Sequence, residues 1–131
     1  MGNILIVDDE QRIRDLLRNV LVSQGHKIYA AATGSQALMA MEVSQPDLIL
    51  LDVAMPDMDG IQFLRILRST PEWAHTPVIL LTAFANPEQT SHVAHLNVCG
   101  QFTKASFSIR ELRAHVAEQL TGHAPATPAG A

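Results

Sequence analysis

Five short apolar runs recur along the chain, and segments with a helical pattern separate them. Turn residues or charged residues bound each run, which is typical of strands that are buried on both faces of a sheet. The runs predict strands at about residues 3–7, 27–31, 48–51, 78–81 and 99–103.

Between and after the strands, apolar residues return at the 3.6-residue period of amphipathic helices. The predicted helices end before Gly25, end before Pro46, begin behind Asp59-Gly60, begin at Asn86-Pro87, and begin behind Ser108. The last helix is the best marked, because Ser108 and Glu111 form a capping box ahead of an apolar stripe.

Strands that alternate with helices imply βαβ units, whose right-handed crossovers produce a parallel sheet with helices on both faces. We therefore expect an α/β fold, a doubly wound (βα)5 three-layer sandwich with a five-stranded parallel sheet in the order 2-1-3-4-5. The length of 131 residues fits one domain, expected over residues 1–120. Residues 121–131 have no periodicity, which favours a disordered tail or the stub of a linker.

Polar side chains stand where the apolar runs end. Asp8 and Asp9 follow the first run, and the third, fourth and fifth runs end at Asp52, Thr82 and Lys104. In doubly wound sheets the ligand site lies beyond the carboxyl ends of the strands, at the switch point between strands one and three. The pattern therefore predicts that three acids, one hydroxyl and one ammonium group meet in a shallow cleft.

The composition narrows the class of partner and the location. The formal charge of −4 gives no sign of the basic character that attracts nucleic acid or an anionic membrane. No apolar stretch approaches the roughly 20 residues that cross a bilayer, and the N-terminus lacks a secretory pattern. A single cysteine, Cys99, suits a reducing compartment. We expect a cytoplasmic protein that binds neither nucleic acid nor membrane.

The residues of the expected cleft favour phosphoryl chemistry. Crowded carboxylates repel one another unless a hard cation is bound. Oxygen ligands without nearby His or Cys favour Mg²⁺, which retains water and accepts a phosphoryl oxygen. A carboxylate that attacks phosphorus forms an acyl phosphate, and Lys104 and Thr82 would then hold other phosphoryl oxygens.

Four motifs stand on separate expected strands, in a fixed order over about residues 3–120. They are Ile4-Leu5-Ile6-Val7-Asp8-Asp9-Glu10, Leu51-Asp52 with Met55-Pro56-Asp57-Met58-Asp59-Gly60, Leu81-Thr82-Ala83, and Thr103-Lys104. With them the chain resembles the receiver domain of two-component response regulators, the CheY-like superfamily. The resemblance implies the flavodoxin-like fold already expected from the alternation of strands and helices.

The resemblance implies a role for each acid. Asp52 would be the phosphoacceptor, taking a phosphoryl group from a sensor histidine kinase or a histidine phosphotransfer protein. Asp9 would bind Mg²⁺ directly, Asp8 mainly through water, and Asp52 and the backbone carbonyl of Ala54 would complete the protein ligands.

The resemblance also implies how a signal leaves the site. Thr82 would move toward the phosphoryl group and Lys104 would pair with it. The motion would repack the face made by the fourth helix, fifth strand and last helix, where a downstream effector or fused output domain docks. A homodimer is a further possibility. Such a domain is a signalling module rather than an enzyme, although it has intrinsic phosphotransfer activity.

The lifetime of the phosphorylated state depends on side chains near the phosphoacceptor and the threonine. Family members often place polar groups two residues after each of them, where they orient an attacking water. Here these positions are Ala54 and Phe84. Ala54 cannot orient water and Phe84 would shield the acyl phosphate, so we expect slow autodephosphorylation.

Two positions depart from the family pattern. Gln101 stands where an aromatic switch residue is usual, and Ala105 stands where a cis-proline is usual. These departures favour an alternative, a receiver-like interaction module that switches without phosphorylation. A third candidate, an aspartyl-phosphate phosphatase of the haloacid dehalogenase type, lacks a general acid because Ala54 occupies the required position.

Overall fold

The computed structural model describes residues 2–55, 58–82, 98–104 and 107–122. Its elements in chain order are β1 (Asn3–Val7), α1 (Gln11–Val22), β2 (Lys27–Ala31), α2 (Gly34–Ser44), β3 (Leu48–Asp52), α3 (Gly60–Ser69), a short 3₁₀ turn η1 (Pro71–Trp73), β4 (Val78–Thr82), β5 (Val98–Thr103) and α4 (Ile109–Gly122). Among the helices within these residues, none has the length and apolar character needed to cross a membrane.

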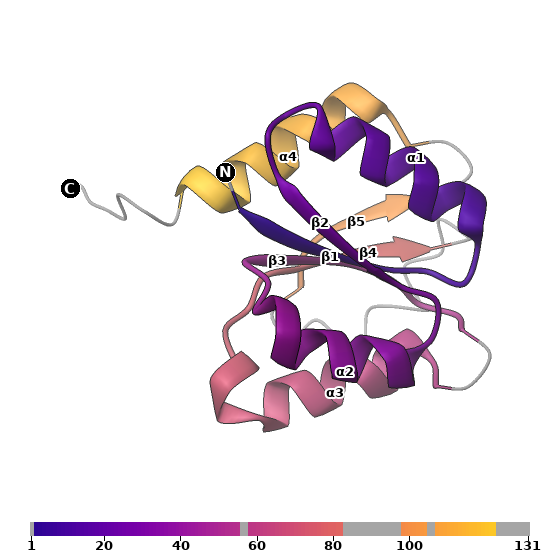
Figure 1. Cartoon of the computed structure of the whole chain (residues 1–131), viewed down its shortest axis with the longest axis vertical. Coiled ribbons are helices and arrows are strands. Elements are labelled where there is room, and N and C mark those ends of the chain that lie inside the picture. The colour runs from indigo at the N-terminus through magenta and orange to yellow at the C-terminus, as the bar shows by residue number, and fades with distance from the viewer. Residues whose placement is uncertain (1, 56–57, 83–97, 105–106, 123–131) are drawn as a thin grey trace.

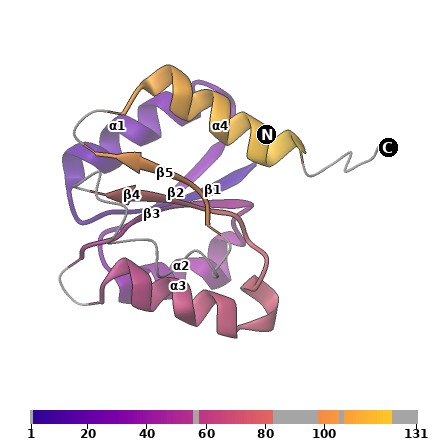
Figure 2. The same cartoon turned by 180° about the vertical axis from the view of Figure 1, so that it is seen from behind.

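All the strands belong to one parallel sheet in the order β2-β1-β3-β4-β5. Helices α1 and α4 cover one face of this sheet, and α2 and α3 cover the other (Figures 1 and 2). The predicted three-layer, doubly wound fold is therefore confirmed. The switch point lies between β1 and β3, as the strand order requires.

Each face of the sheet has its own hydrophobic core, because successive side chains of a strand point to opposite faces. In β1, Leu5 and Val7 pack in the cluster under α2 and α3. Ile4 and Ile6 pack in the cluster under α1 and α4. The central strands β3 and β4 are buried along their whole length, which explains why they read as unbroken apolar runs.

Helix starts follow the chemistry of the capping residues. The Asp59 side chain accepts a hydrogen bond from Gln62 N at 2.8 Å, and the Gln62 side chain accepts one from Asp59 N at 3.2 Å. This reciprocal capping box begins α3 at Gly60. At α4, the Ser108 hydroxyl accepts a hydrogen bond from Glu111 N at 3.2 Å, which is one of the two bonds of the predicted capping box.

The element boundaries differ from the sequence expectation by one or two residues. Strands β3 and β4 extend to Asp52 and Thr82, because these residues still pair with the neighbouring strand. Helix α4 continues to Gly122, two residues into the segment assigned to a tail, within the usual uncertainty of helix ends. The helix predicted to begin at Asn86-Pro87 and the remaining tail residues lie outside the described part of the chain.

Candidate functional site at the carboxyl edge of the sheet

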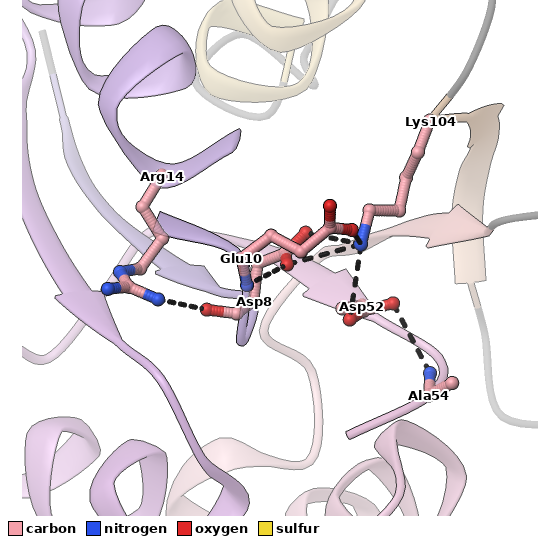
Figure 3. A network of polar contacts seen from close by, with 6 residues as sticks. All are labelled: Asp8, Glu10, Arg14, Asp52, Ala54 and Lys104. Carbon is pink, nitrogen blue, oxygen red and sulfur yellow. Dashed lines mark hydrogen bonds and ion pairs between the residues drawn. The ribbon is translucent and has the colours of Figure 1, made fainter. Parts of the chain in front are cut away.

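The pairing of the strands places the predicted site residues at one edge of the sheet. Val7 pairs with Leu51, so Asp8 and Asp52 follow adjacent positions on β1 and β3. On the other side, Thr82 pairs with Thr103, the residue before Lys104. Lys104 N donates a hydrogen bond to Thr82 O at 2.7 Å. Residues at the ends of four strands therefore lie along this edge, and Figure 3 shows those at the ends of β1, β3 and β5.

The Lys104 ammonium group lies among three carboxylates (Figure 3). Its Nζ is 3.1 Å from Asp8 Oδ2, 3.4 Å from Asp52 Oδ2 and 2.5 Å from Glu10 Oε1. The lysine side chain is only 10% exposed, so these ion pairs are weakly screened by solvent. The predicted convergence of strand-end acids and the lysine is present in the structure.

Asp8 is fully buried and held by its own loop. Its Oδ1 accepts a hydrogen bond from Glu10 N at 2.8 Å, and its backbone carbonyl accepts one from Arg14 Nη1 at 2.8 Å. Its Oδ2 is in ion-pair range of Lys104, but no group in the described residues donates a well-directed hydrogen bond to it. A buried oxygen of this kind is costly unless a donor or cation reaches it.

Asp52 ends β3 with 2% of its surface exposed. Burial is the main cause that raises its pKa from 3.8 to about 7, and the charge of Asp8 and a hydrogen bond with Asp9 act in the same direction. The Lys104 ammonium and the Ala54 N–H, which lies 3.2 Å from Asp52 Oδ1, oppose the shift in pKa. Without a metal, Asp52 is therefore mainly protonated only below about pH 7, far above the range in which an ordinary aspartate takes up a proton.

The same surroundings shift the pKa values of Asp8 and Lys104. Burial also raises the pKa of Asp8, although Glu10 N–H and Lys104 counteract it. Burial by itself lowers the pKa of Lys104, but its contacts with Glu10, Asp8 and Asp52 outweigh burial and raise the pKa above its ordinary value. Lys104 is thus a permanent cation between carboxyl groups that are costly to ionise.

The donor set fits a hard divalent cation. Carboxylate oxygens of Asp8, Asp9 and Glu10 lie within 4.8 Å of one another. Asp9 is exposed, so it can exchange water for a metal. The buried Asp8 Oδ2 without a hydrogen-bond donor supplies an oxygen that a cation can satisfy. Oxygen ligands of this kind suit Mg²⁺.

Two contacts of the site were missed by the sequence analysis, which gave no role to Glu10 or Arg14. Glu10 makes the shortest ion pair of Lys104, and Arg14 binds the Asp8 carbonyl. The position of Glu10 directly after two acids was the available signal. Thr82, in contrast, is where it was predicted, at the buried end of β4.

The raised pKa of Asp52 predicts how the stability of the metal-free protein depends on pH. The pKa of an aspartate in an unfolded chain is about 3.9. Between about pH 4 and about pH 7, the folded chain therefore retains a proton on Asp52 that the unfolded chain releases. The free energy of unfolding thus falls as pH rises through this interval. Mg²⁺ binds the ionised acids, so it should raise the melting temperature more at about pH 8 than at about pH 5. Calorimetry of the wild type and Asp52→Asn, with and without Mg²⁺, measures this. A metal-free wild type that gains stability relative to Asp52→Asn over this pH interval contradicts the prediction.

Comparison with known proteins identifies the family. The model of the response regulator receiver domain matches residues 4–117. The KDP operon transcriptional regulatory protein KdpE of Escherichia coli is 38% identical over 128 residues, 97% of this chain but 55% of KdpE. This chain thus spans about half the length of KdpE.

Two further proteins match along nearly their whole length. The sporulation initiation phosphotransferase F of Bacillus subtilis is 38% identical over 89% of this chain and 92% of its own. The solved signal receiver domain of a signal transduction histidine kinase from Syntrophus aciditrophicus has a TM-score of 0.85 at 31% identity, covering 98% of this chain and 96% of that one. By its sequence match and its fold, the chain belongs to the receiver domain family of two-component response regulators.

Proposed function

We propose that this receiver domain accepts a phosphoryl group on Asp52 and signals through its phosphorylated state. The observation that supports this most strongly is the environment of Asp52. Its carboxylate ends a buried strand, lies 3.4 Å from the Lys104 ammonium and shares the site with Asp8. Burial and the charge of Asp8 also raise the pKa of Asp52, and carboxyl groups with strongly raised pKa values gather at functional sites.

The donor we propose is the phosphohistidine of a sensor histidine kinase or histidine phosphotransfer protein. A carboxylate oxygen of Asp52 attacks the phosphorus, the new O–P bond forms as the N–P bond breaks, and the imidazole leaves and takes up a proton. Lys104 is positioned to neutralise the charge of the phosphoryl oxygens, because its ammonium already contacts Asp52. Thr82, adjacent on β4, is the proposed hydroxyl donor.

The proposed metal ligands are Asp8, Asp9, Asp52 and the backbone carbonyl of Ala54. When bound, Mg²⁺ would neutralise charge on the acids and on the incoming phosphoryl group. The residues themselves give the site its shape. The Glu10 N–H fixes Asp8 Oδ1, which also accepts a hydrogen bond from Lys104 Nζ at 3.2 Å. The Ala54 N–H fixes Asp52 Oδ1, which leaves Asp52 Oδ2 facing Lys104.

The expected output route remains a prediction. Gln101, in place of the usual aromatic residue, is exposed on β5, so a switch at this position would act without a buried ring. Phe84, Ala105 and the helix expected from Asn86-Pro87 lie outside the described residues. The downstream effector or fused output domain, a homodimer, slow autodephosphorylation and the cytoplasmic location stay predictions as well.

Phosphate labelling of the wild type and Asp52→Asn tests the proposal. Acetyl phosphate with Mg²⁺ should add one phosphoryl group to the wild type and none to Asp52→Asn, as measured by intact-protein mass spectrometry. Asp15→Asn, which removes an exposed acid on α1, is the matched control and should label like the wild type. If Asp52→Asn is still labelled, Asp52 is not the phosphoacceptor. No labelling of the wild type, together with no response to beryllofluoride, would favour the interaction module that switches by binding alone.

A further inference from the structure

Among the described residues, Glu10 is the acid closest to the Lys104 ammonium. The Oε1–Nζ separation is 2.5 Å, against 3.1 Å for the nearer Asp8 oxygen and 3.4 Å for Asp52. These groups come from β5 and from the ends of β1 and β3, with Glu10 at the start of α1 (Figure 3). An ammonium group has three hydrogens to donate, so three carboxylates fully occupy it.

The three partners differ in burial. Asp8 and Asp52 have side chains 0% and 3% exposed, whereas the Glu10 side chain is 48% exposed. Glu10 therefore approaches Lys104 from the solvent side of the site. Its backbone N–H is bound to Asp8 Oδ1 at 2.8 Å, which fixes the base of the side chain close to the ammonium.

We propose that Glu10 is a positioning residue that restrains Lys104 and lowers the affinity of the site for a phosphoryl group. This rests on the proposed function of Asp52. A phosphoryl group on Asp52 needs the ammonium for its own oxygens, so Lys104 must give up its contact with Glu10. Glu10 thus disfavours the phosphorylated state, and substitutions of Glu10 change the affinity of the site for a phosphoryl group.

The experiment compares Glu10→Gln, Glu10→Asp and the exposed-acid control Asp15→Asn. Glu10→Gln removes the charge, whereas Glu10→Asp keeps the charge but withdraws the carboxylate by one methylene. The first readout is the apparent affinity for beryllofluoride at saturating Mg²⁺, followed by NMR. Both Glu10 variants should bind beryllofluoride about three- to tenfold more tightly than the wild type.

The second readout needs neither metal nor phosphoryl analogue. Lys27 and Lys104 are the only lysines of the chain, so trace acetylation followed by peptide mass spectrometry reports Lys104 against an exposed internal reference. Loss of the Glu10 contact uncovers the Lys104 amine on the solvent side of the site, so the Lys104-to-Lys27 labelling ratio should rise at least about twofold in both Glu10 variants. Asp15→Asn should leave both readouts unchanged.

The outcomes separate a restraint of Lys104 by Glu10 from a general effect of charge. If Glu10→Asp behaves like the wild type and only Glu10→Gln binds beryllofluoride more tightly, the net charge alone is responsible and the proposed restraint is wrong. Unchanged labelling ratios and affinities in both Glu10 variants overturn it as well. If the wild type binds no beryllofluoride, the proposed function fails and the effect on phosphoryl affinity fails with it. A raised labelling ratio in that case still shows that Glu10 restrains the lysine.

Discussion

Replacing Lys104 by methionine is expected to cost about 3–5 kcal/mol of unfolding free energy at about pH 8 without Mg²⁺, because two buried carboxylates then lose their cation. Both Asp8 and Asp52 lie in ion-pair contact with this ammonium and are almost fully buried. At about pH 5 the loss should be smaller, since the acids can take up protons instead of remaining charged. Urea unfolding at the two pH values measures the difference.

Lys27→Met is the matched control for this substitution. Lys27 is the other lysine of the chain, is exposed on the edge strand β2 and lies 5.6 Å above the Tyr29 ring. Its replacement should cost less than about 1 kcal/mol at either pH, as expected of an exposed charge. Equal losses for Lys104→Met at both pH values would show that the carboxylates do not depend on the ammonium.

Replacing Gly60 by alanine is expected to destabilise the fold by about 3 kcal/mol, the upper range for overpacking a well-packed site. A Cβ at this position would overlap the Asp52 carbonyl oxygen and lie 2.9 Å from Val53 Cα. Both are backbone atoms, so they cannot move aside as a flexible side chain would. The Gly60 N–H also donates to Val53 O at 2.6 Å, which holds the start of α3 against the end of β3.

Gly2→Ala supplies the comparison. The added Cβ there would meet the ends of two side chains, Leu120 at 3.1 Å and Asp47 at 3.2 Å, which can shift. Chemical denaturation should place the Gly2 variant within about 1 kcal/mol of the wild type and the Gly60 variant well below it. If Gly60→Ala unfolds at the wild-type denaturant midpoint, the close approach of α3 to the end of β3 does not constrain the fold.

The local pattern of apolar and polar residues was sufficient to predict the fold. Strands β3 and β4 are central and buried on both faces, so their sequences must be continuously apolar and can be recognised without neighbours. Edge strand β5 is partly exposed and less regular in composition, which is why its start was placed one residue late. Handedness and parallel pairing then leave few arrangements for alternating strands and helices.

The order of residues along the chain is enough to predict which chemical groups gather, since parallel strands end at a common edge and Asp8, Asp52, Thr82 and Lys104 stand at those ends. How these groups share charge depends on the folded arrangement. Lys104 and Asp8 are 96 residues apart in sequence, and their separation depends on strand register and side-chain direction. The same geometry brings Glu10 closest to the ammonium and leaves Asp8 Oδ2 without a donor among the described residues. Ion-pair strength and pKa depend steeply on distance and burial, quantities that exist only once the chain has folded.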